Sequence, residues 1–353
     1  MSCLDLRDLT KSELEKWVQD LGLPRFRANQ IFRWVWTPGI YSFDQMTNLS
    51  KVLRSEIGKR ACIGLLRKLD VQASKDGTIK FAWLLKDGHI VESVLIPERN
   101  HYTLCLSTQV GCAMGCVFCH TAKMGFKRNL TSGEIATQAL AALEHSSVGS
   151  EMKNLVFMGM GEPLANYENL INALQILTDD HGLNFSWRRI TVSTCGLVPQ
   201  MLRLGQETNA GLAVSLHAPD DELRSRLMPV NKRFPLNELI EGCRRYPLSK
   251  RRRITFEYIL LGGINDSIDH ARRLAKLLRG IRSKINLIPY NHSPDLPFKS
   301  PASSDVEAFR KELLRHNYTA IVRKSKGTDI KAACGQLYAE HCRPEQAACA
   351  SIS

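Results

Sequence analysis

The sequence predicts an α/β protein built on a partial (β/α)6 barrel, with a small N-terminal helical domain and a β-hairpin extension. Three observations lead to this prediction. From about residue 103 onward, short apolar runs alternate with segments of helical periodicity, as in parallel β/α units. The first 60 residues show helical spacing only, and residues 66–97 form strand-like runs around an Asp-Gly turn. The chain of 353 residues is long enough for a barrel and two small additions.

Residues 1–65 are expected to form a helical accessory domain that binds RNA. Thr10, with Glu13 three residues later, has the spacing of a helix N-cap, and residues 48–51 begin another short helix. Three aromatic residues at helical spacing are best explained by core packing: Phe32, Trp34 and Trp36. The alternative interpretation is that neighbouring basic side chains face RNA phosphates: Arg25, Arg27, Arg33 and Lys51.

Residues 66–100 are expected to form the hairpin extension, because two strand-like runs, 81–85 and 89–96, flank Lys86-Asp87-Gly88. The barrel is assigned to residues 101–340. Its expected strands are 103–107, 154–158, 189–193, 211–216, 254–260, 285–288 and 319–323, and the helices between them include 132–145, 170–178 and 271–278. About six such units suit a partial barrel better than the full eight-unit one. The tail, 341–353, loses periodicity and is expected to fray.

Charge and composition narrow the class of protein. The chain has 48 Lys and Arg against 35 Asp and Glu, a formal net charge of +13, which favours a nucleic-acid partner over a charge that serves solubility alone. It has no long apolar run, and its N-terminus lacks the apolar core of a secretory signal, so we expect a cytoplasmic protein with no membrane contact. In a reducing cytosol its 11 cysteines would serve as thiols, metal ligands or catalytic groups.

The most specific motif is a cysteine cluster directly after the first expected barrel strand. Cys112, Cys116 and Cys119 have the spacing C-x3-C-x2-C, and close-set thiolates on one loop can bind an iron–sulfur cluster or zinc. Three cysteines on a cubane cluster leave one iron open for a substrate or cofactor. A structural zinc ion needs a fourth ligand, and His120 follows Cys119 too directly to supply it. The pattern therefore favours a [4Fe–4S] cluster.

This motif, at this place in a β/α chain, resembles the radical S-adenosylmethionine (radical SAM) superfamily. Gly161 and Glu162, in a Gly-Glu-Pro motif after the next strand, add to the resemblance. It implies that the open iron binds S-adenosylmethionine (SAM), and that reduction of the complex gives a 5′-deoxyadenosyl radical. It also implies a radical SAM barrel as the fold. Further residues implied to contact the cofactor are Ser193, Ser215, Leu216, His217 and Asn291. Taken alone, His217 would be read as a core histidine.

Four further segments are similar to the RlmN/Cfr family of RNA methyltransferases, over roughly residues 5–340: 26–31, 91–94, 103–112 and 329–337. This resemblance implies methylation of an adenine of 23S rRNA at C2, in the peptidyl-transferase centre, and in some members of a tRNA adenine beside the anticodon. The close alternative is methylation at C8, since both chemistries use the same cysteines. An alternative from another class is a zinc-stabilised RNA-binding protein without catalysis. Cys342 and Cys349 lie outside the resemblance.

The family resemblance also assigns roles to three residues. The target carbon of adenine is not nucleophilic, so it should fail to attack the methyl group of SAM directly. A carbon radical that adds to the ring can form the new bond instead. Cys334 is implied to carry the methyl group, Cys105 to release the product by forming a disulfide with Cys334, and Glu92 to remove the adenine proton. The alternatives are that both cysteines are packing residues and that Glu92 is a solvent-facing strand residue. Cys195, where a serine was expected, is interpreted as packing.

The implied partners are 23S rRNA, tRNA in some members, a one-electron reductant and a disulfide reductant. Basic residues expected to contact RNA phosphates lie in three groups: Lys123, Lys127 and Arg128; residues 250–253; and Arg224, Arg226, Lys232 and Arg233. The motifs do not separate C2 from C8. The residues do not determine the oligomeric state, and we expect a monomer.

Overall fold

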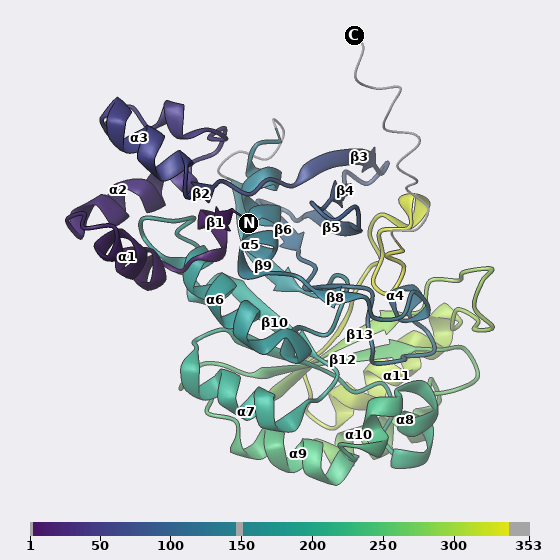
Figure 1. Ribbon diagram of the computed structural model, residues 1–353. Helices are drawn as coiled ribbons and strands as arrows, with labels where there is room; N and C mark the ends of the chain where they lie inside the picture. Colours follow the sequence, from purple (N-terminus) through teal and green to yellow (C-terminus); the bar gives the residue numbers. More distant parts are fainter. Residues whose placement is uncertain (1–2, 146–150, 339–353) are drawn as a thin grey trace.

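The computed structural model describes residues 3–145 and 151–338 (Figure 1). Its centre is one sheet of ten strands in the order β14-β13-β12-β11-β10-β9-β6-β5-β4-β3. Seven neighbouring strands of this sheet are parallel: β6 (Tyr102–Cys105), β9 (Met152–Phe157), β10 (Ile190–Thr194), β11 (Gly211–Ser215), β12 (Ile254–Leu260), β13 (Ser283–Pro289) and β14 (Ala320–Val322). Each lies within two residues of its predicted position, because most of these strands are short runs rich in buried apolar residues.

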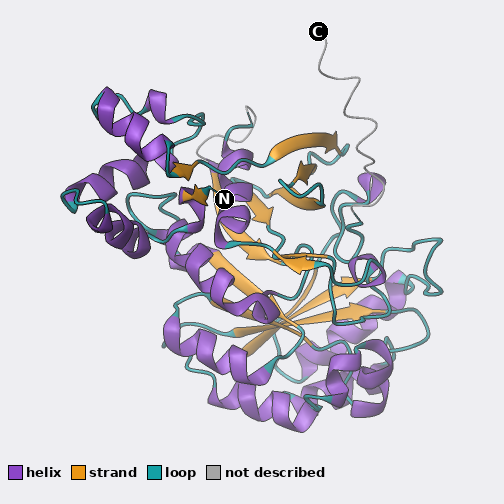
Figure 2. Cartoon of the chain, viewed as in Figure 1, coloured by secondary structure: helices purple, strands orange, loops and turns teal. Residues whose placement is uncertain are grey.

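Helices connect the parallel strands and cover the outside of the sheet (Figure 2). They are α5 (Ser132–Leu143), α6 (Tyr167–Thr178), α7 (Val198–Glu207), α8 (Asp221–Leu227), α9 (Leu236–Arg245), α10 (Ile268–Leu277) and α11 (Ser303–Arg315). Within the described residues they form six crossover connections, which confirms the predicted partial (β/α)6 barrel. No helix in the described residues is both long and apolar enough to span a lipid bilayer.

The segment before the barrel, for which the sequence predicts a β-hairpin extension, adds three strands to this sheet. Strands β3 (Arg67–Ala73), β4 (Ile79–Leu84) and β5 (Ile90–Pro97) form an antiparallel meander, and β5 pairs with β6 in the register Val94↔Cys105. The predicted Asp-Gly turn lies between β4 and β5, where Gly88 has φ 84°. Strand β3 was not predicted, because it is a half-buried edge strand with mixed polar residues.

The N-terminal part contains α1 (Lys11–Asp20), α2 (Phe26–Val35) and α3 (Lys51–Gly58), with a two-stranded sheet of β1 (Leu4–Asp5) and β2 (Ala61–Cys62). The capping box of Thr10 and Glu13 is confirmed, and Ser50 caps α3. Phe32 and Trp36 are buried, as core packing predicts. The remaining short elements are β7 (Gln109–Val110), β8 (Arg128–Asn129), α4 (His120–Lys123) and the 3-10 helices Leu6–Asp8, Phe43–Gln45, Pro163–Asn166, Trp187–Arg189, Pro229–Lys232 and Thr328–Ile330.

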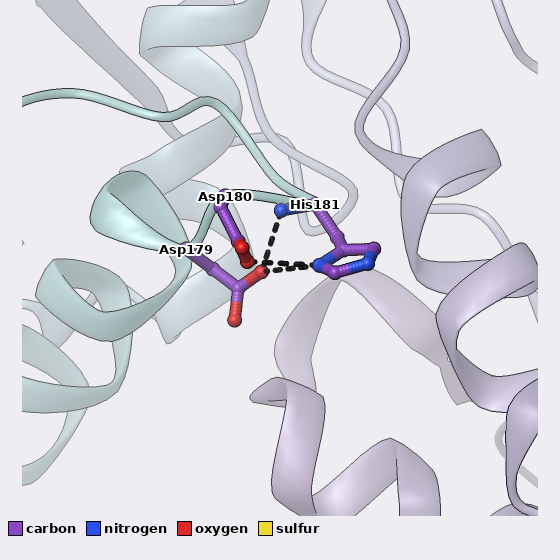
Figure 3. Close-up of side chains that lie close together, drawn as sticks. All are labelled: Asp179, Asp180 and His181. Atoms are coloured by element: carbon purple, nitrogen blue, oxygen red, sulfur yellow. Dashed lines mark hydrogen bonds and ion pairs between the residues drawn. The ribbon is translucent and has the colours of Figure 1, made fainter.

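Polar contacts join the N-terminal part to the barrel helices. Asp8 accepts a hydrogen bond from the backbone N–H of Gly133 at the start of α5, at 3.0 Å. After α6, the side chains of Asp179, Asp180 and His181 gather in one place (Figure 3). Lys11 of α1 inserts here, with its Nζ 3.0 Å from His181 Nδ1 and 3.8 Å from an Asp179 oxygen. Because Lys11 already pairs with both carboxylates, we interpret the trio as a structural contact between α1 and the segment after α6.

Candidate active site

A cavity of about 240 Å³ lies at the carboxyl ends of the parallel strands. Its walls come from the cysteine loop after β7, from the ends of β6 and β9–β13, and from residues 323–337. Eleven of the predicted site residues line it: Cys105, Cys112, Cys116, Cys119, Gly161, Glu162, Ser193, Ser215, His217, Asn291 and Cys334. Glu92 and Leu216 are not among the lining residues. The carboxyl ends of parallel strands are where enzymes of this architecture place their sites.

The cysteine loop is held by backbone contacts at several points. Gly111 has φ 72°, and a Cβ there would lie 1.7 Å from the carbonyl oxygen of Gly125, so only glycine fits. The N–H of Cys112 donates to that same carbonyl at 3.2 Å, and Cys119 N–H donates to the carbonyl of Cys116 at 3.1 Å. The three thiols are thereby presented from one short, well-defined turn.

The thiols fit a cluster better than a single metal ion. In the described residues the only trio of metal-ligand atoms within 4.8 Å of one another is that of Asp179, Asp180 and His181, so at least two of the three cysteine sulfurs are more than 4.8 Å apart. Sulfurs around one tetrahedral zinc ion would be about 3.8 Å apart, given a Zn–S bond near 2.3 Å. Cysteines on a cubane each bind a different iron and are more widely spaced. Burial raises the pKa of Cys112 to about 12, so a bound cation is needed to make its thiol a thiolate.

The Gly-Glu-Pro motif fixes a carboxylate at the edge of the cavity. Gly161 has φ 97°, and a Cβ there would lie 2.5 Å from the Gln109 side chain, so glycine is required. Both Glu162 oxygens accept backbone hydrogen bonds, from Leu164 N–H at 3.0 Å and from Cys195 N–H at 2.8 Å. Burial raises the pKa of Glu162 despite these bonds. A carboxylate held this way suits the ammonium group of an amino-acid moiety.

His217 faces the cavity and is also a structural residue. Its φ is 61°, and its Nδ1 accepts the backbone N–H of Ile259 at 3.0 Å. Burial, and secondarily the charge of Arg224, lowers the pKa of His217 to about 3, so the ring is neutral and leaves Nε2–H as a donor. Leu216 beside it is fully buried in the core. Any contact of Leu216 with a cofactor would therefore come from its backbone.

Cys105 and Cys334 line the same cavity although 229 positions separate them (334 minus 105). Cys105 ends β6 and is buried, and burial raises its pKa to about 12. Cys334 lies in the segment after β14 and is exposed. Both are free thiols. The segment of Cys334 is tied to the cysteine loop, because His120 N–H donates to the Gly335 carbonyl and Thr121 Oγ1 to the Leu337 carbonyl, both at 2.8 Å.

Glu92, on β5, contacts the end of the segment that carries Cys334. Its side chain is 1% exposed, so the alternative of a solvent-facing strand residue is wrong. One carboxylate oxygen is 3.1 Å from Lys80 Nζ, and the other accepts the N–H of Tyr338 at 2.9 Å. Sequence reasoning missed Lys80 and also missed Glu257, a buried cavity residue on β12. A charged residue inside an apolar strand run, the signal that drew attention to Glu92, would have found Glu257.

Several of the basic residues that were predicted to contact RNA phosphates are buried, paired with carboxylates or distant from the cavity. Arg224 was expected to bind RNA, and this is wrong, because its side chain is fully buried and bonded to backbone carbonyls and Asn231. The guanidinium of Arg128 forms ion pairs with Asp87 and Glu134, so carboxylates of the protein already neutralise its charge. Residues 250–253 precede β12 and so lie at the strand end opposite the cavity. Cys342 and Cys349 lie outside the described residues.

The fold and this thiol-lined cavity define the class, a radical SAM enzyme. A family model for the radical SAM superfamily matches residues 106–275, and one for the ribosomal RNA large subunit methyltransferase N-terminal domain matches residues 4–63. Two similar proteins are called dual-specificity RNA methyltransferase RlmN. That of Syntrophus aciditrophicus is 50% identical over 96% of this chain and 97% of its own length, and that of Geobacter sulfurreducens is 51% identical over 95% and 92%. The crystal structure of a radical SAM methyltransferase from Sphaerobacter thermophilus superposes with a TM-score of 0.89 at 46% identity, covering 96% of this chain and 100% of that one.

The chain therefore belongs to the RlmN family of radical SAM RNA methyltransferases. This membership confirms the resemblance, the fold class, the enzyme class and the cofactors, a [4Fe–4S] cluster and SAM. It also means that the alternative of a non-catalytic zinc protein is wrong. The boundaries of the domains and the roles of individual site residues remain predictions.

Proposed function

We propose that this enzyme methylates C2 of an adenine in the peptidyl-transferase centre of 23S rRNA, and of an adenine beside the anticodon of tRNA, through a methylated Cys334. One observation carries the proposal: two free thiols, Cys105 and Cys334, line the same cavity as the three cluster cysteines. The name dual-specificity RNA methyltransferase, carried by the relatives, supports two RNA substrates.

The cofactors supply the methyl group and the radical chemistry. In the proposal, Cys112, Cys116 and Cys119 hold the cluster, and the Glu162 carboxylate holds the amino group of SAM. Ser193, Ser215, His217 and Asn291 line the remaining wall of the cavity and are the further candidates for contacts with it. The neutral ring of His217 offers one N–H to this wall and carries no charge that would repel the sulfonium.

In the proposal, Cys334 carries the methyl carbon to RNA, and Cys105 then releases the product from Cys334. Cys334 Sγ carries this carbon as a thioether. One C–H bond of the methyl group breaks, and its hydrogen atom passes to the 5′-deoxyadenosyl radical that the bound cofactors would supply. The carbon then bonds to C2 of adenine, and the adduct loses the C2 hydrogen as a proton and one electron, which the cluster would accept, so that Sγ–CH2–C2 links the protein to RNA. Cys105 Sγ attacks Cys334 Sγ and breaks the S–C bond. The carbon takes up the Cys105 proton to become a methyl group, and a disulfide remains. An external dithiol reductant restores the two thiols.

Glu92 is proposed as the acceptor of the C2 proton. Its carboxylate is positioned by Lys80, whose Nζ lies 3.1 Å from one of the oxygens. Glu92 does not line the cavity, and Tyr338 N–H occupies one of its oxygens. Proton removal therefore requires residues 335–338 to shift away from β5.

A labelling experiment tests the carrier role. Enzyme bearing a CD3 group on Cys334 should deliver CD2 plus one hydrogen to RNA in the first turnover and give singly deuterated 5′-deoxyadenosine. Cys105→Ala should leave protein bonded to RNA, and Glu92→Gln should slow the step after addition. Cys243→Ala, a buried cysteine on α9 away from the cavity, is the matched control and should behave as wild type. An intact CD3 group on the product adenine would contradict the proposal.

The position of the methyl group is tested separately. Mass spectrometry of digested rRNA and tRNA from a deletion strain, before and after complementation, should show the loss and return of 2-methyladenine. Return of 8-methyladenine instead would replace C2 by C8.

A further inference from the structure

One side of the cavity is lined by basic residues that sequence analysis did not select. Arg323, Lys324 and Lys326 follow β14 directly and line the cavity; we call these three residues the basic rim. Arg323 and Lys324 are exposed and Lys326 is half-buried. In residues 3–145 and 151–338, the side chains of Lys324 and Lys326 form no ion pair and no hydrogen bond.

In the described residues, Lys324 and Lys326 have no ion-pair partner, unlike several other basic side chains. Arg203 pairs with Glu168 and Glu207, Arg310 pairs with Glu307, and Arg128 pairs with two carboxylates. In contrast, the two rim lysines stand two positions apart, close to Arg323, at an opening in the protein surface. Neighbouring charges of one sign raise the local electrostatic potential and concentrate the opposite ion beside them. The basic rim is therefore built for an anion.

Backbone contacts hold the basic rim in place at both ends. Arg323 N–H donates to the Leu287 carbonyl at 2.8 Å, and Gly327 N–H donates to Asp76 at 3.0 Å. Gly327 has φ 62°, and a Cβ there would lie 2.8 Å from the Cβ of Ala332 and 2.9 Å from Cγ2 of Thr78. A rim fixed this closely loses little backbone entropy when an anion binds.

The geometry of the substrate indicates which anion this is. An enzyme that modifies a base takes the nucleotide out of its stack and admits the base to a pocket, while the backbone stays outside. Cys334 lies eight positions after Lys326 (334 minus 326), in the same segment and on the same cavity. A base that reaches Cys334 therefore leaves its flanking phosphates at the cavity opening, beside the exposed Lys324 and the half-buried Lys326.

We propose that the basic rim binds the RNA phosphates next to the target adenine, with Lys324 and Lys326 as the contacts. This inference rests on the proposed function, since it assumes that an adenine of RNA enters this cavity. The lysines act on binding, and they are not proposed to take part in the chemical steps.

The test compares two double variants that each remove two lysine charges. Lys324→Ala with Lys326→Ala changes the basic rim, and Lys276→Ala with Lys311→Ala changes two exposed lysines on the outer helices α10 and α11. Binding to a 23S rRNA fragment that contains the target adenine is measured over a range of salt concentrations. The rim variant should bind at least tenfold more weakly at low salt, and its slope of log K against log salt should fall by about 2. The variant of the outer helices should keep the wild-type slope.

Further measurements keep the outcome unambiguous. Iron content, thermal unfolding and SAM cleavage without RNA should be unchanged in the rim variant, and Lys324→Arg with Lys326→Arg should restore binding. Equal losses in both double variants, unchanged RNA affinity, or a loss of SAM affinity in place of RNA affinity would each overturn the inference; the last would assign the rim to the carboxylate of the cofactor. The position of the methyl group on the product reports on the proposed function independently of RNA affinity.

Discussion

Replacing Arg224 by methionine should destabilise the protein strongly. The guanidinium donates to the carbonyls of Cys195 at 2.7 Å, Ser215 at 3.2 Å and Leu216 at 3.2 Å, and to Asn231 Oδ1 at 2.8 Å. It thus ties the ends of β10 and β11 to the segment after α8. A hydrogen bond to a charged group contributes about 1.5–3 kcal/mol, and the desolvation of the buried charge offsets part of the sum of four. Methionine refills part of the volume, so we expect the free energy of unfolding to fall by about 2–4 kcal/mol.

The assay is chemical and thermal unfolding of wild type and variant, with Arg226→Met as the matched control. Arg226 lies on the same helix and is exposed, so its replacement should change stability by less than about 0.5 kcal/mol. For Arg224→Met the midpoint of thermal unfolding should fall by roughly 4–16 °C, at about 2–4 °C per kcal/mol. A variant that unfolds like wild type but binds RNA more weakly would refute this reasoning, because Arg224 would then reach the RNA.

Two further predictions concern the cavity. Cys116→Ala should lose the cluster and all cleavage of SAM, measured as iron per chain and as 5′-deoxyadenosine, whereas Cys243→Ala should keep both; a fully loaded Cys116→Ala enzyme would contradict the ligand assignment. Glu257→Gln should alter the pH dependence of stability. Burial raises the pKa of Glu257 although Asn286 and Arg323 oppose the shift, so the folded state keeps this proton to a higher pH than the unfolded state does. As pH rises from about 4.5, wild type should therefore lose unfolding free energy relative to the variant, by up to about 1.4 kcal/mol per pH unit until the folded-state pKa is passed. Urea titrations between pH 4.5 and 7 measure this difference, and parallel curves for the two proteins would show that Glu257 is not responsible.

The sequence predicts those parts of the fold that a local pattern determines. Strand β12 was predicted with its observed bounds, 254–260, because it is a largely apolar run that is buried throughout. The capping box of Thr10 and Glu13 was found because it depends on residues three positions apart. The cysteine motif is equally local, which is why its three thiols could be assigned to one site.

Features that depend on distant partners could not be read from the sequence. Arg224 and Arg226 look alike on a helix, and only the neighbouring strand ends show that one is buried against carbonyls. The ion pair of Lys80 with Glu92 depends on the register of β4 against β5. The basic rim lies between a strand and the Cys334 motif, and only the cavity reveals its position.

The last described residues return to the first strands of the sheet, beside β3–β5 in Figure 1. Tyr338 contacts Glu92 across 246 positions, Gly327 contacts Asp76 across 251, and Asp329 contacts Ser74 across 255. A protein is synthesised from its N-terminus, and its early parts can fold before the late ones exist. The first strands of the sheet and the cysteine loop can therefore form early in translation, but the segment with Cys334 can dock only after the strands that precede it have been synthesised. A chain interrupted before this point could bind cofactors without being able to carry a methyl group to RNA.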